Sequence, residues 1–463
     1  MQETFTKEYL EERRKAKRIS FTFPTKTLTG VIGETLNLSA SGVCLALERP
    51  FFSTQTIQIQ IDFPFSLPLQ TYVEIIWRKP QAQNHRFLCG VKFLKLHKKN
   101  AQILKEALEQ YTTLNAEFVF LTERMRDWLT EFKIKCDQFD AMYADRFKQI
   151  DFIEKNWADV KNILNQHFKA VGRLIENFNP KEYLLHQKYY QNMLWPLLKD
   201  HVEINRFITS KPFGYAGDFK IMNYFYDYHY QYLGESSYEK IINFYTCNIP
   251  IAFSVIERKN FFKEKIEELL KDPDKDIVKI LSVASGSCRE LIELAEEEKI
   301  NKPLYFDCLD LESEAFDDIK NRLNKIDRQN KRYLNIRFNN ENFLFLIKEK
   351  NVLNIFEEYD LIYSAGLFDY LNERLAKKLI ASMFRLLDQD GTLCITNVKK
   401  DPDYQPYYTM LGEWKLIHRS ADEVLALREE IKETNYAKLI RLETKEPFMF
   451  WILTLRKNLV EPF

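Results

Sequence analysis

The chain has 463 residues, of which 45% are hydrophobic and 14% aromatic, and its 67 lysines and arginines balance 67 aspartates and glutamates. At about 150 residues per domain, this length predicts about three domains and excludes a single small module. The lack of net charge excludes the global attraction on which nonspecific nucleic-acid binders depend. We therefore expect no nucleic-acid polymer as a partner and only local anion sites.

The apolar runs and the cysteines indicate compartment and metal content. Charged residues interrupt every apolar run before the roughly 20 residues that a membrane helix needs, and the segment 1–18 lacks the apolar core of a signal peptide. We therefore expect no transmembrane segment and a cytoplasmic location. The seven cysteines form no CxxC pair or Cys/His cluster, so we expect neither a disulfide framework nor a metal site.

Short β-type runs rich in branched and aromatic residues occupy the region from Ile19 to Phe93, separated by Pro, Asn, Ser and Gly. The runs are ISFTF, LTGVIGETL, GVCLAL, TIQIQIDF, YVEIIW and FLCGVKF. This pattern predicts a small antiparallel β-barrel, to which we assign residues 1–100.

The next part of the chain is predicted to be all helical. Neither glycine nor proline occurs between Val91 and Val171, and apolar residues recur there at three- and four-residue spacing. We assign residues 101–250 to a helical connector, through which a homodimer could form, and expect helices to continue to near Leu270. Breaks are expected near Gly172, Pro180 and Pro196, and the run KDPDKD is expected to be a turn.

From residue 251 onward, apolar strands alternate with helical segments, which predicts an α/β doubly wound, Rossmann-like domain over residues 251–463. The expected strands include IVKILSV, PLYFDCLDL, YLNIRF, EEYDLIYSAG and TLCITNV, with DQDG as a turn and EPFMFWILTLRK as an added edge strand. In such sheets, ligands bind at the carboxyl ends of the strands.

A first candidate site combines two short motifs. Arg14 and Arg18 stand before the run Asn37-Leu38-Ser39-Ala40-Ser41-Gly42. Guanidinium groups suit phosphate oxygens and the edge of guanine, Asn and Ser donate at short range, and glycine permits close backbone approach. Either motif alone is typical of a solvated tail or a hairpin turn.

Together the two motifs resemble the PilZ family, whose RxxxR and [D/N]xSxxG sequences bind cyclic di-GMP. The resemblance covers roughly the first 100 residues, including the barrel-like strands. It implies a cyclic di-GMP site in which Arg13 stacks on a base. The implied site residues are Arg13, Arg14, Arg18, Asn37, Ser39 and Gly42.

A second candidate site begins at a loop of small residues, Ala284-Ser285-Gly286-Ser287-Cys288-Arg289-Glu290, between a strand and a helix. Small side chains let a cofactor approach the backbone, and a helix N-terminus favours a carboxylate. The next strand ends in Asp310, followed by Glu312, which places an acid where a ribose would be held. Nucleotide-dependent dehydrogenases share this plan, but their GxGxxG is absent, since Ala284 and Cys288 stand where glycine is common.

Residues 250–455 resemble the class I S-adenosylmethionine-dependent methyltransferases, with ASGSCRE as their first motif. More narrowly, ILSVASGSCRE, IYSAGLFDYL and a YAGD segment look like motifs of the 3-hydroxypalmitate methyl ester biosynthesis family. The resemblance implies S-adenosylmethionine as the cofactor, Asp310 as its ribose ligand and Asn342 near the adenine, while Ser282 stands where many members carry an acid. The implied cofactor residues are Ala284, Ser285, Gly286, Ser287, Arg289, Glu290, Asp310, Asn342 and Gly366.

The YAGD segment lies within KPFGYAGDFKIMNYFYDY, at residues 211–228, where Gly214 and Gly217 bracket Tyr215. Spacing alone predicts a packed corner in which Asp218 caps a helix. With the resemblance added, we interpret the segment as a lid or a wall of a substrate pocket. The implied catalytic residues are Tyr215, Asp218, Asp369 and Tyr370.

Methyl transfer needs an acceptor lone pair aligned behind a sulfonium methyl in a site that excludes water. A carboxylate acceptor needs no general base, whereas other acceptors would need one, for which Asp218, His229 and Asp369 are candidates. We therefore expect a bacterial-type, cyclic di-GMP-responsive methyltransferase that acts on the carboxylate of a fatty or hydroxy-fatty acid. The alternative is a cyclic di-GMP-binding signalling adaptor with a catalytically inactive, methyltransferase-like scaffold.

Overall fold

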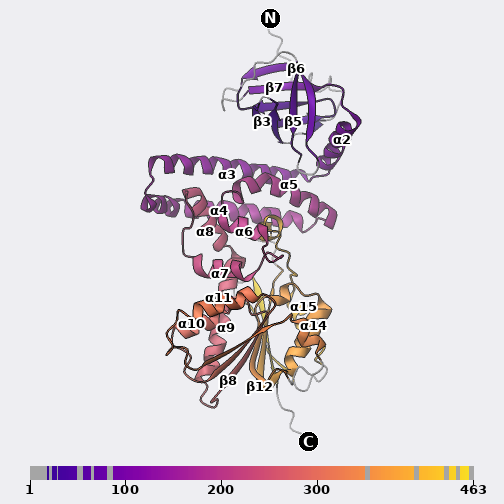
Figure 1. Ribbon diagram of the computed structural model, residues 1–463. Helices are drawn as coiled ribbons and strands as arrows, with labels where there is room; N and C mark the ends of the chain where they lie inside the picture. Colours follow the sequence, from indigo (N-terminus) through magenta and orange to yellow (C-terminus); the bar gives the residue numbers. More distant parts are fainter. Residues whose placement is uncertain are drawn as a thin grey trace. The chain divides into compact units, whose positions relative to one another are not determined.

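The computed structural model describes residues 18–19, 23–28, 30–49, 56–63, 67–80, 87–349, 355–400, 406–431, 437–444 and 449–457 (Figure 1). The chain divides into two compact units, Met1–Arg124 with Asn177–Met193, and Met125–Glu176 with Leu194–Phe463. The predicted fold class is confirmed, because an antiparallel barrel, a set of helices and an α/β sheet are all present. The boundaries that we assigned at residues 100 and 250 stay predictions.

The first unit contains the barrel. Its strands pair in the order β1-β3-β2-β5-β6-β7-β4, and β3 also pairs with β4, which closes the barrel. Closure leaves no long unpaired edge, and apolar side chains such as Leu38, Leu45 and Val73 are buried. The strands are β1 (Arg18–Ile19), β2 (Pro24–Thr27), β3 (Ile32–Ser39), β4 (Gly42–Leu47), β5 (Thr56–Ile61), β6 (Leu69–Pro80) and β7 (Phe87–Phe93).

Helix α2 (Lys98–Thr112) follows the barrel and packs on it through Tyr111, whose ring centroid lies 4.6 Å from that of Phe23. The breaks expected near Gly172 and Pro180 occur close to their predicted positions, because one helix ends shortly after Gly172 and the next starts at Pro180. Pro196 lies inside that second helix, which ends two residues later at Leu198. These helices are α3 (Ala116–Met142), α4 (Arg146–Ile175), α5 (Pro180–Leu198), α6 (Glu203–Ser210), α7 (Phe219–Tyr228), α8 (Ser237–Cys247) and α9 (Pro250–Lys271).

The second unit contains a mixed sheet in the order β10-β9-β8-β11-β12-β14-β13. Strands β10, β9, β8, β11 and β12 are parallel, and β14 and β13 are antiparallel to their neighbours. The strand order reverses between β8 and β11, which is the switch point where such sheets bind ligands. The strands are β8 (Val278–Val283), β9 (Leu304–Asp310), β10 (Leu334–Asn340), β11 (Tyr359–Ser364), β12 (Leu387–Val398), β13 (Ala437–Glu443) and β14 (Phe450–Lys457).

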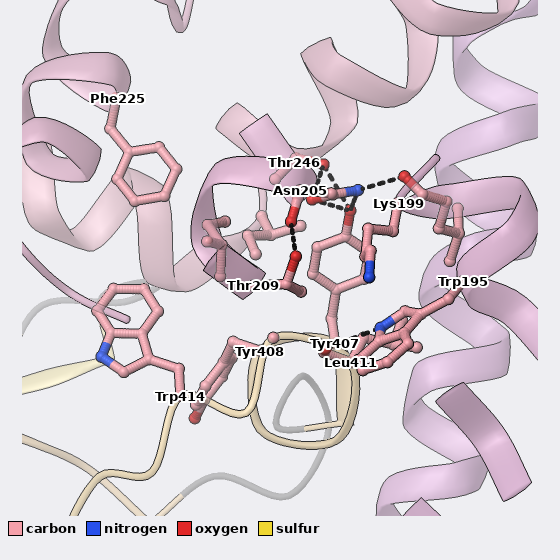
Figure 2. A pocket seen from close by; sticks show the side chains of 14 residues that line it. Trp195, Lys199, Asn205, Thr209, Phe225, Thr246, Tyr407, Tyr408, Leu411 and Trp414 are labelled. Atoms are coloured by element: carbon pink, nitrogen blue, oxygen red, sulfur yellow. Dashed lines mark hydrogen bonds between the residues drawn. The ribbon is translucent and has the colours of Figure 1, made fainter. Parts of the chain in front are cut away.

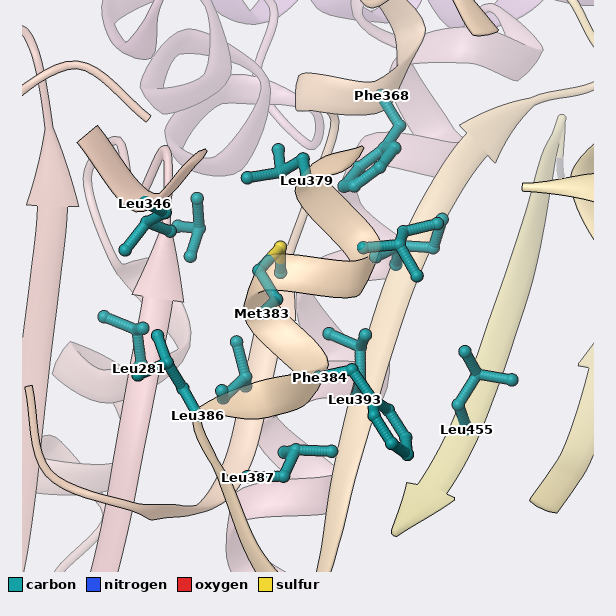
Figure 3. Packing of buried hydrophobic residues seen from close by; sticks show 14 of the residues in the cluster. Leu281, Leu346, Phe368, Leu379, Met383, Phe384, Leu386, Leu387, Leu393 and Leu455 are labelled. Atoms are coloured by element: carbon teal, nitrogen blue, oxygen red, sulfur yellow. The ribbon is translucent and has the colours of Figure 1, made fainter. Parts of the chain in front are cut away.

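Helices cover both faces of this sheet. On one face, α14 places apolar residues at helical spacing, including Leu379 and Met383, against Leu281 and Leu393 of the sheet (Figure 3). On the other face, α9, α10 and α11 pack on alternate strand residues such as Phe306. The remaining elements are α10 (Arg289–Glu296), α11 (Ser313–Leu323), α12 (Leu344–Lys348), η1 (Leu367–Asp369), α14 (Glu373–Arg385), the π-helix η2 (Tyr407–Leu411) and α15 (Ala421–Ala426).

Two local predictions in this domain were wrong. Strand β14, within EPFMFWILTLRK, is not the edge strand, because it lies between β12 and β13. The run DQDG is not a turn before a strand but a bulge inside β12. Tyr359 of β11 pairs with Leu387, and Leu361, two residues later, pairs with Thr392, so the DQDG residues between Leu387 and Thr392 bulge out of the pairing. Both features depend on pairing with distant strands, which local spacing does not reveal.

None of the helices within the described ranges is long and apolar enough to cross a membrane.

Candidate functional site

The barrel brings the two halves of its nucleotide motif together through strand pairing. Strand β1 pairs with β3 so that Arg18 lies opposite Ser39. The second arginine of RxxxR is therefore next to the serine of the Asn37–Gly42 turn. Arg13 and Arg14 lie outside the described residues.

Two residues of the turn have structural roles as well. Ser39 Oγ donates to the carbonyl oxygen of Gly42, 3.1 Å away, and accepts from the backbone N–H of Ser41. A Cβ atom at Gly42 would lie 2.3 Å from the carbonyl oxygen of Val91, so the close approach of β7 requires glycine there. Asn37 is half-buried.

Sequence reasoning missed Trp77, which lies in the same row of paired strand residues as Asn37, with β7 and β4 between them. Through strand pairing, Trp77 on β6 is opposite Gly90, Gly90 is opposite Cys44, and Cys44 is opposite Asn37. Because Gly90 has no side chain, the Trp77 indole lies directly over it, and a Cβ at Gly90 would be 2.1 Å from Trp77 Nε1. The Trp77 side chain is 44% exposed. It offers an aromatic surface on which a base can stack, in the row of residues that contains Asn37.

The second unit contains a cavity of about 490 Å³ at the carboxyl ends of β8, β9 and β11. The cavity therefore lies at the switch point of the sheet, as the alternation of strands and helices predicted. The structure brings all the cofactor residues implied by the resemblance into its lining. They are Ala284, Ser285, Gly286, Ser287, Arg289, Glu290, Asp310, Asn342 and Gly366, and Tyr215, Asp369 and Tyr370 line it too.

The loop after β8 keeps a glycine-like backbone although two of its residues are not glycine. Ala284, Gly286 and Cys288 have φ values of 53°, 53° and 40°, in the left-handed region. That conformation costs about 1–2 kcal/mol for a residue with a Cβ atom. Ala284 and Cys288 therefore adopt a backbone conformation that glycine adopts without this cost.

Asp310 links this loop to β9. Its Oδ2 accepts from the backbone N–H of Gly286 at 2.8 Å, and its Oδ1 accepts from that of Glu312 at 2.9 Å. Burial raises the pKa of Asp310, and these backbone donors oppose the rise. The carboxylate thus lies at the cavity wall, beside the loop that the sequence assigned to the cofactor.

The cavity also holds a buried carboxylate near Ser282. Glu290 accepts a hydrogen bond from the Tyr363 hydroxyl, and Tyr363 on β11 is opposite Ser282 on β8. Burial raises the pKa of Glu290. The start of α10 thus supplies an acidic group to the part of the cavity that Ser282 lines.

The YAGD corner forms one wall of the cavity. Trp414 Nε1 donates to the Tyr370 hydroxyl at 2.7 Å, and a Cβ at Gly217 would lie 2.4 Å from that hydroxyl. Glycine is therefore required where this corner meets Tyr370. The ring of Tyr215 contacts that of Tyr370 edge-on, with centroids 6.1 Å apart.

Two candidate bases lie outside the cavity lining. Asp218 caps α7 by accepting from the backbone N–H groups of Lys220 and Ile221, which is the role that spacing alone predicted. His229 Nδ1 is 2.9 Å from the carbonyl oxygen of Phe225. Of the three candidate bases, Asp369 is the one that lines the cavity.

Asp369 is buried at the end of η1 and is 3% exposed. Its Oδ1 accepts from the backbone N–H of Val398 at 2.6 Å, and its Oδ2 lies 3.9 Å from Arg258 Nη1. Burial raises the pKa of Asp369 to about 7, against the opposing charges of Arg258 and Arg419. Arg258 is a second lining residue that the sequence did not single out.

We expect Asp369→Asn to stabilise the protein at pH 8, because the buried charge is then absent. The folded-state pKa of Asp369 is above its usual value of 3.8, so its contribution to stability is full below pH 4 and is lost as pH rises through 7. A shift of this size corresponds to at most about 4 kcal/mol. Urea unfolding at pH 5 and pH 8 should show the advantage of the variant shrinking at the lower pH. An equal difference at both pH values would contradict the prediction.

A small apolar pocket of about 30 Å³ adjoins the cavity and shares Trp414 with it (Figure 2). Figure 2 shows the rings of Tyr407, Tyr408 and Trp414 arranged around the pocket together with Trp195 of α5 and Phe225 of α7. Asn205 Nδ2 donates to the Tyr407 hydroxyl at 3.1 Å, so the polar end of that ring is satisfied. The pocket has room for about one water molecule.

Among the residues that the structure describes, no group of three or more His, Cys, Asp or Glu side chains could hold a metal ion.

Comparison with known families identifies one part of the chain. Residues 12–111 match the family model of the PilZ domain. The chain thus contains a PilZ domain, and this part of the predicted resemblance is confirmed. No curated protein sequence matches the chain.

Solved structures with related folds have low sequence identity. A possible exported protein from Bordetella parapertussis is 16% identical with a TM-score of 0.42, over 66% of this chain and 97% of that chain. Magnesium protoporphyrin IX methyltransferase from Synechocystis PCC 6803 is 11% identical with a TM-score of 0.31, over 45% and 83%. The N-methyltransferase NodS from Bradyrhizobium japonicum WM9 is 12% identical with a TM-score of 0.28, over 43% and 97%.

Proposed function

We propose that the chain is a cyclic di-GMP-responsive, S-adenosylmethionine-dependent methyltransferase. The main support for the methyltransferase activity is the cavity at the switch point of the sheet. Every residue that we assigned to the cofactor lines this cavity, although these residues come from separate segments of the sequence. The PilZ match and the pairing of Arg18 with Ser39 support the nucleotide part.

The lining of the cavity fits this cofactor. Ser285 Oγ is buried without a hydrogen-bond partner among the described residues, so the loop retains an unused polar group. The Asp310 carboxylate can accept from a ribose diol, and Gly286 lets a ligand approach the backbone. When bound, S-adenosylmethionine supplies an electrophilic methyl group on a sulfonium.

The acceptor that we favour is the carboxylate of a fatty or hydroxy-fatty acid. A carboxylate oxygen already carries the lone pair that methyl transfer requires, and two of the three candidate bases lie outside the cavity lining. Apolar side chains that line the same cavity, including Val255, Leu416 and Phe450, suit an acyl chain.

Calorimetry of the full chain with S-adenosylmethionine and with cyclic di-GMP tests both parts of the proposal. We expect heat from both ligands, and loss of the cyclic di-GMP signal in Arg14→Ala/Arg18→Ala. Trp77→Ala should weaken cyclic di-GMP binding about tenfold, since base stacking on an aromatic ring contributes about 1–3 kcal/mol. Tyr72→Ala is the matched control, because Tyr72 is an exposed aromatic residue on the same strand, opposite Gln58 and outside the row that contains Asn37.

Methyl incorporation with and without cyclic di-GMP tests the coupling. We expect label in free fatty acids and a rate that changes at saturating nucleotide. Label in amines alone would refute the carboxylate acceptor, and equal rates would refute regulation. Binding of cyclic di-GMP without S-adenosylmethionine binding would instead favour the signalling adaptor.

A further inference from the structure

The charges that line the cavity are mostly negative. The lining carboxylates are Glu290, Asp310, Glu312, Glu341 and Asp369, and the lining arginines are Arg258 and Arg289. The Arg289 guanidinium is already held, because its Nη2 donates to Asp227 at 2.7 Å and to Asn223 at 3.3 Å. Among the residues that line the cavity, Arg258 is therefore the cation left for an anionic ligand.

Arg258 lies on α9 and is 7% exposed, yet its guanidinium has no oxygen acceptor within hydrogen-bond distance among the described residues. Its Nε has no partner, its Nη2 is 3.7 Å from the sulfur of Met222, and its Nη1 is 3.9 Å from Asp369 Oδ2. An arginine has five N–H donors, and leaving them unpaired in a buried site is costly. A ligand that supplies two oxygens would remove that cost.

The guanidinium is held in a fixed position. It lies over the ring of Phe450, 4.7 Å from the centroid, and a Cβ at Gly366 would be 2.8 Å from Nη1. Gly366 has a φ of 117°, which other residues rarely adopt, so the close approach of the chain to Arg258 depends on glycine. The chain thus provides a rigid, planar cation at the cavity wall rather than a flexible surface charge.

We propose that Arg258 binds the carboxylate of the methyl acceptor, so that the cavity selects carboxylic acids. This assignment rests on the proposed methyltransferase function. A carboxylate matches the guanidinium fork, and each of its oxygens keeps a second lone pair when it accepts one N–H. The bound carboxylate can therefore still act as the nucleophile, whereas its neutral methyl ester loses the ionic contact to Arg258.

The position of Arg258 supports the acceptor as the source of the carboxylate. Its side chain faces Met222, Asp369 and Phe450, and of the residues assigned to the cofactor only Gly366 lies against its guanidinium. The other cofactor residues lie on the loop after β8, at the end of β9 and at Asn342. The amino-acid end of S-adenosylmethionine also carries a carboxylate. The experiment must therefore separate these two sources.

Calorimetry of the full chain with two pairs of probes makes this separation. The first pair is a straight-chain carboxylate, in a series from acetate to hexadecanoate, and its methyl ester. The second pair is S-adenosylmethionine and its decarboxylated analogue. The proteins are the wild type, Arg258→Gln and Arg258→Lys, with Lys259→Gln as the control because Lys259 is the neighbouring cation on α9, pairs with Glu293 and does not line the cavity.

We expect the wild type to bind the acid 10- to 100-fold more tightly than the ester, in line with a charge-assisted hydrogen-bond pair. Arg258→Gln should lose this preference for the acid and keep its affinity for S-adenosylmethionine. Arg258→Lys should keep part of the preference for the acid, and Lys259→Gln should match the wild type. Loss of S-adenosylmethionine affinity in Arg258→Gln with unchanged affinity for the decarboxylated analogue would assign the carboxylate to the donor and overturn the proposal. An acid preference that persists in Arg258→Gln, or is absent from the wild type, would also overturn it.

If the wild type bound no S-adenosylmethionine, the methyltransferase function itself would fail, and the assignment of Arg258 to the acceptor would fail with it. This failure can be told apart from failure of the Arg258 assignment alone, because it appears in the wild type when S-adenosylmethionine is the only ligand added.

Discussion

Asp310→Ala is expected to weaken S-adenosylmethionine binding about a hundredfold without lowering the stability of the ligand-free protein. The carboxylate can accept two hydrogen bonds from a ribose diol, and bonds to a charged group contribute about 1.5–3 kcal/mol each. Its removal also takes away the acceptor of the Gly286 N–H, so the loop loses its link to β9. Both effects reduce affinity for the same ligand.

The stability of the ligand-free protein should change little because two effects oppose each other. The hydrogen bonds from the N–H groups of Gly286 and Glu312 are lost, and the cost of burying a charge, which raises the pKa of Asp310, is removed. Calorimetry gives the affinity and urea unfolding the stability. Glu312→Ala is the control, because Glu312 is an acid two residues away that also lines the cavity but accepts no bond from the loop. Equal losses of affinity in the two variants would contradict the role of Asp310.

Arg419→Met is expected to lower the free energy of unfolding by about 3–5 kcal/mol, which is the largest loss of stability that we predict. Arg419 is 4% exposed and donates to the carbonyl oxygens of Phe368 and Leu371 and to the side chain of Asn397. Methionine fills similar space but donates nothing, so three buried acceptors lose a partner. The affected segment includes Asp369 and Tyr370, and ligand binding should therefore fall as well.

Urea unfolding followed by tryptophan fluorescence measures the loss. Arg385→Met is the control, since Arg385 is exposed near the end of α14 and, among the described residues, its side chain bonds only to Ser382. A change of about 0.5 kcal/mol or less is expected for this control. A similarly small change for Arg419→Met would show that other groups or water satisfy the three acceptors.

The barrel motif was predictable in part. Each of its two motifs is a short continuous run of residues, so each can be recognised from sequence. Strand pairing places Arg18 of the first motif opposite Ser39 of the second, as a shared binding site requires. Trp77 escaped prediction because its position depends on the register of three strands and on an irregularity between Ile75 and Trp77. A shift of one residue in a strand moves a side chain to the opposite face.

The proposed cofactor site was likewise predictable only in part. The loop at 284–290 and Asp310 follow strands that are recognisable from apolar runs, so their meeting at one sheet edge was predictable. Arg258 stands in the run IERKN, in which charged residues are typical of any solvated helix. Its burial and its lack of an oxygen partner emerge only when α9, η1 and β14 pack together.

The sequence by itself determined the order of barrel, helices and α/β sheet, and the segments that carry the two sites, because periodicity and short motifs are local properties of the chain. Only the tertiary structure decided that Asp218 lies outside the cavity lining, that β14 is an inner strand and that Arg258 is the cation available in the cavity. Burial, pairing register and the distance between charges depend on residues far apart in sequence, so local patterns do not determine them.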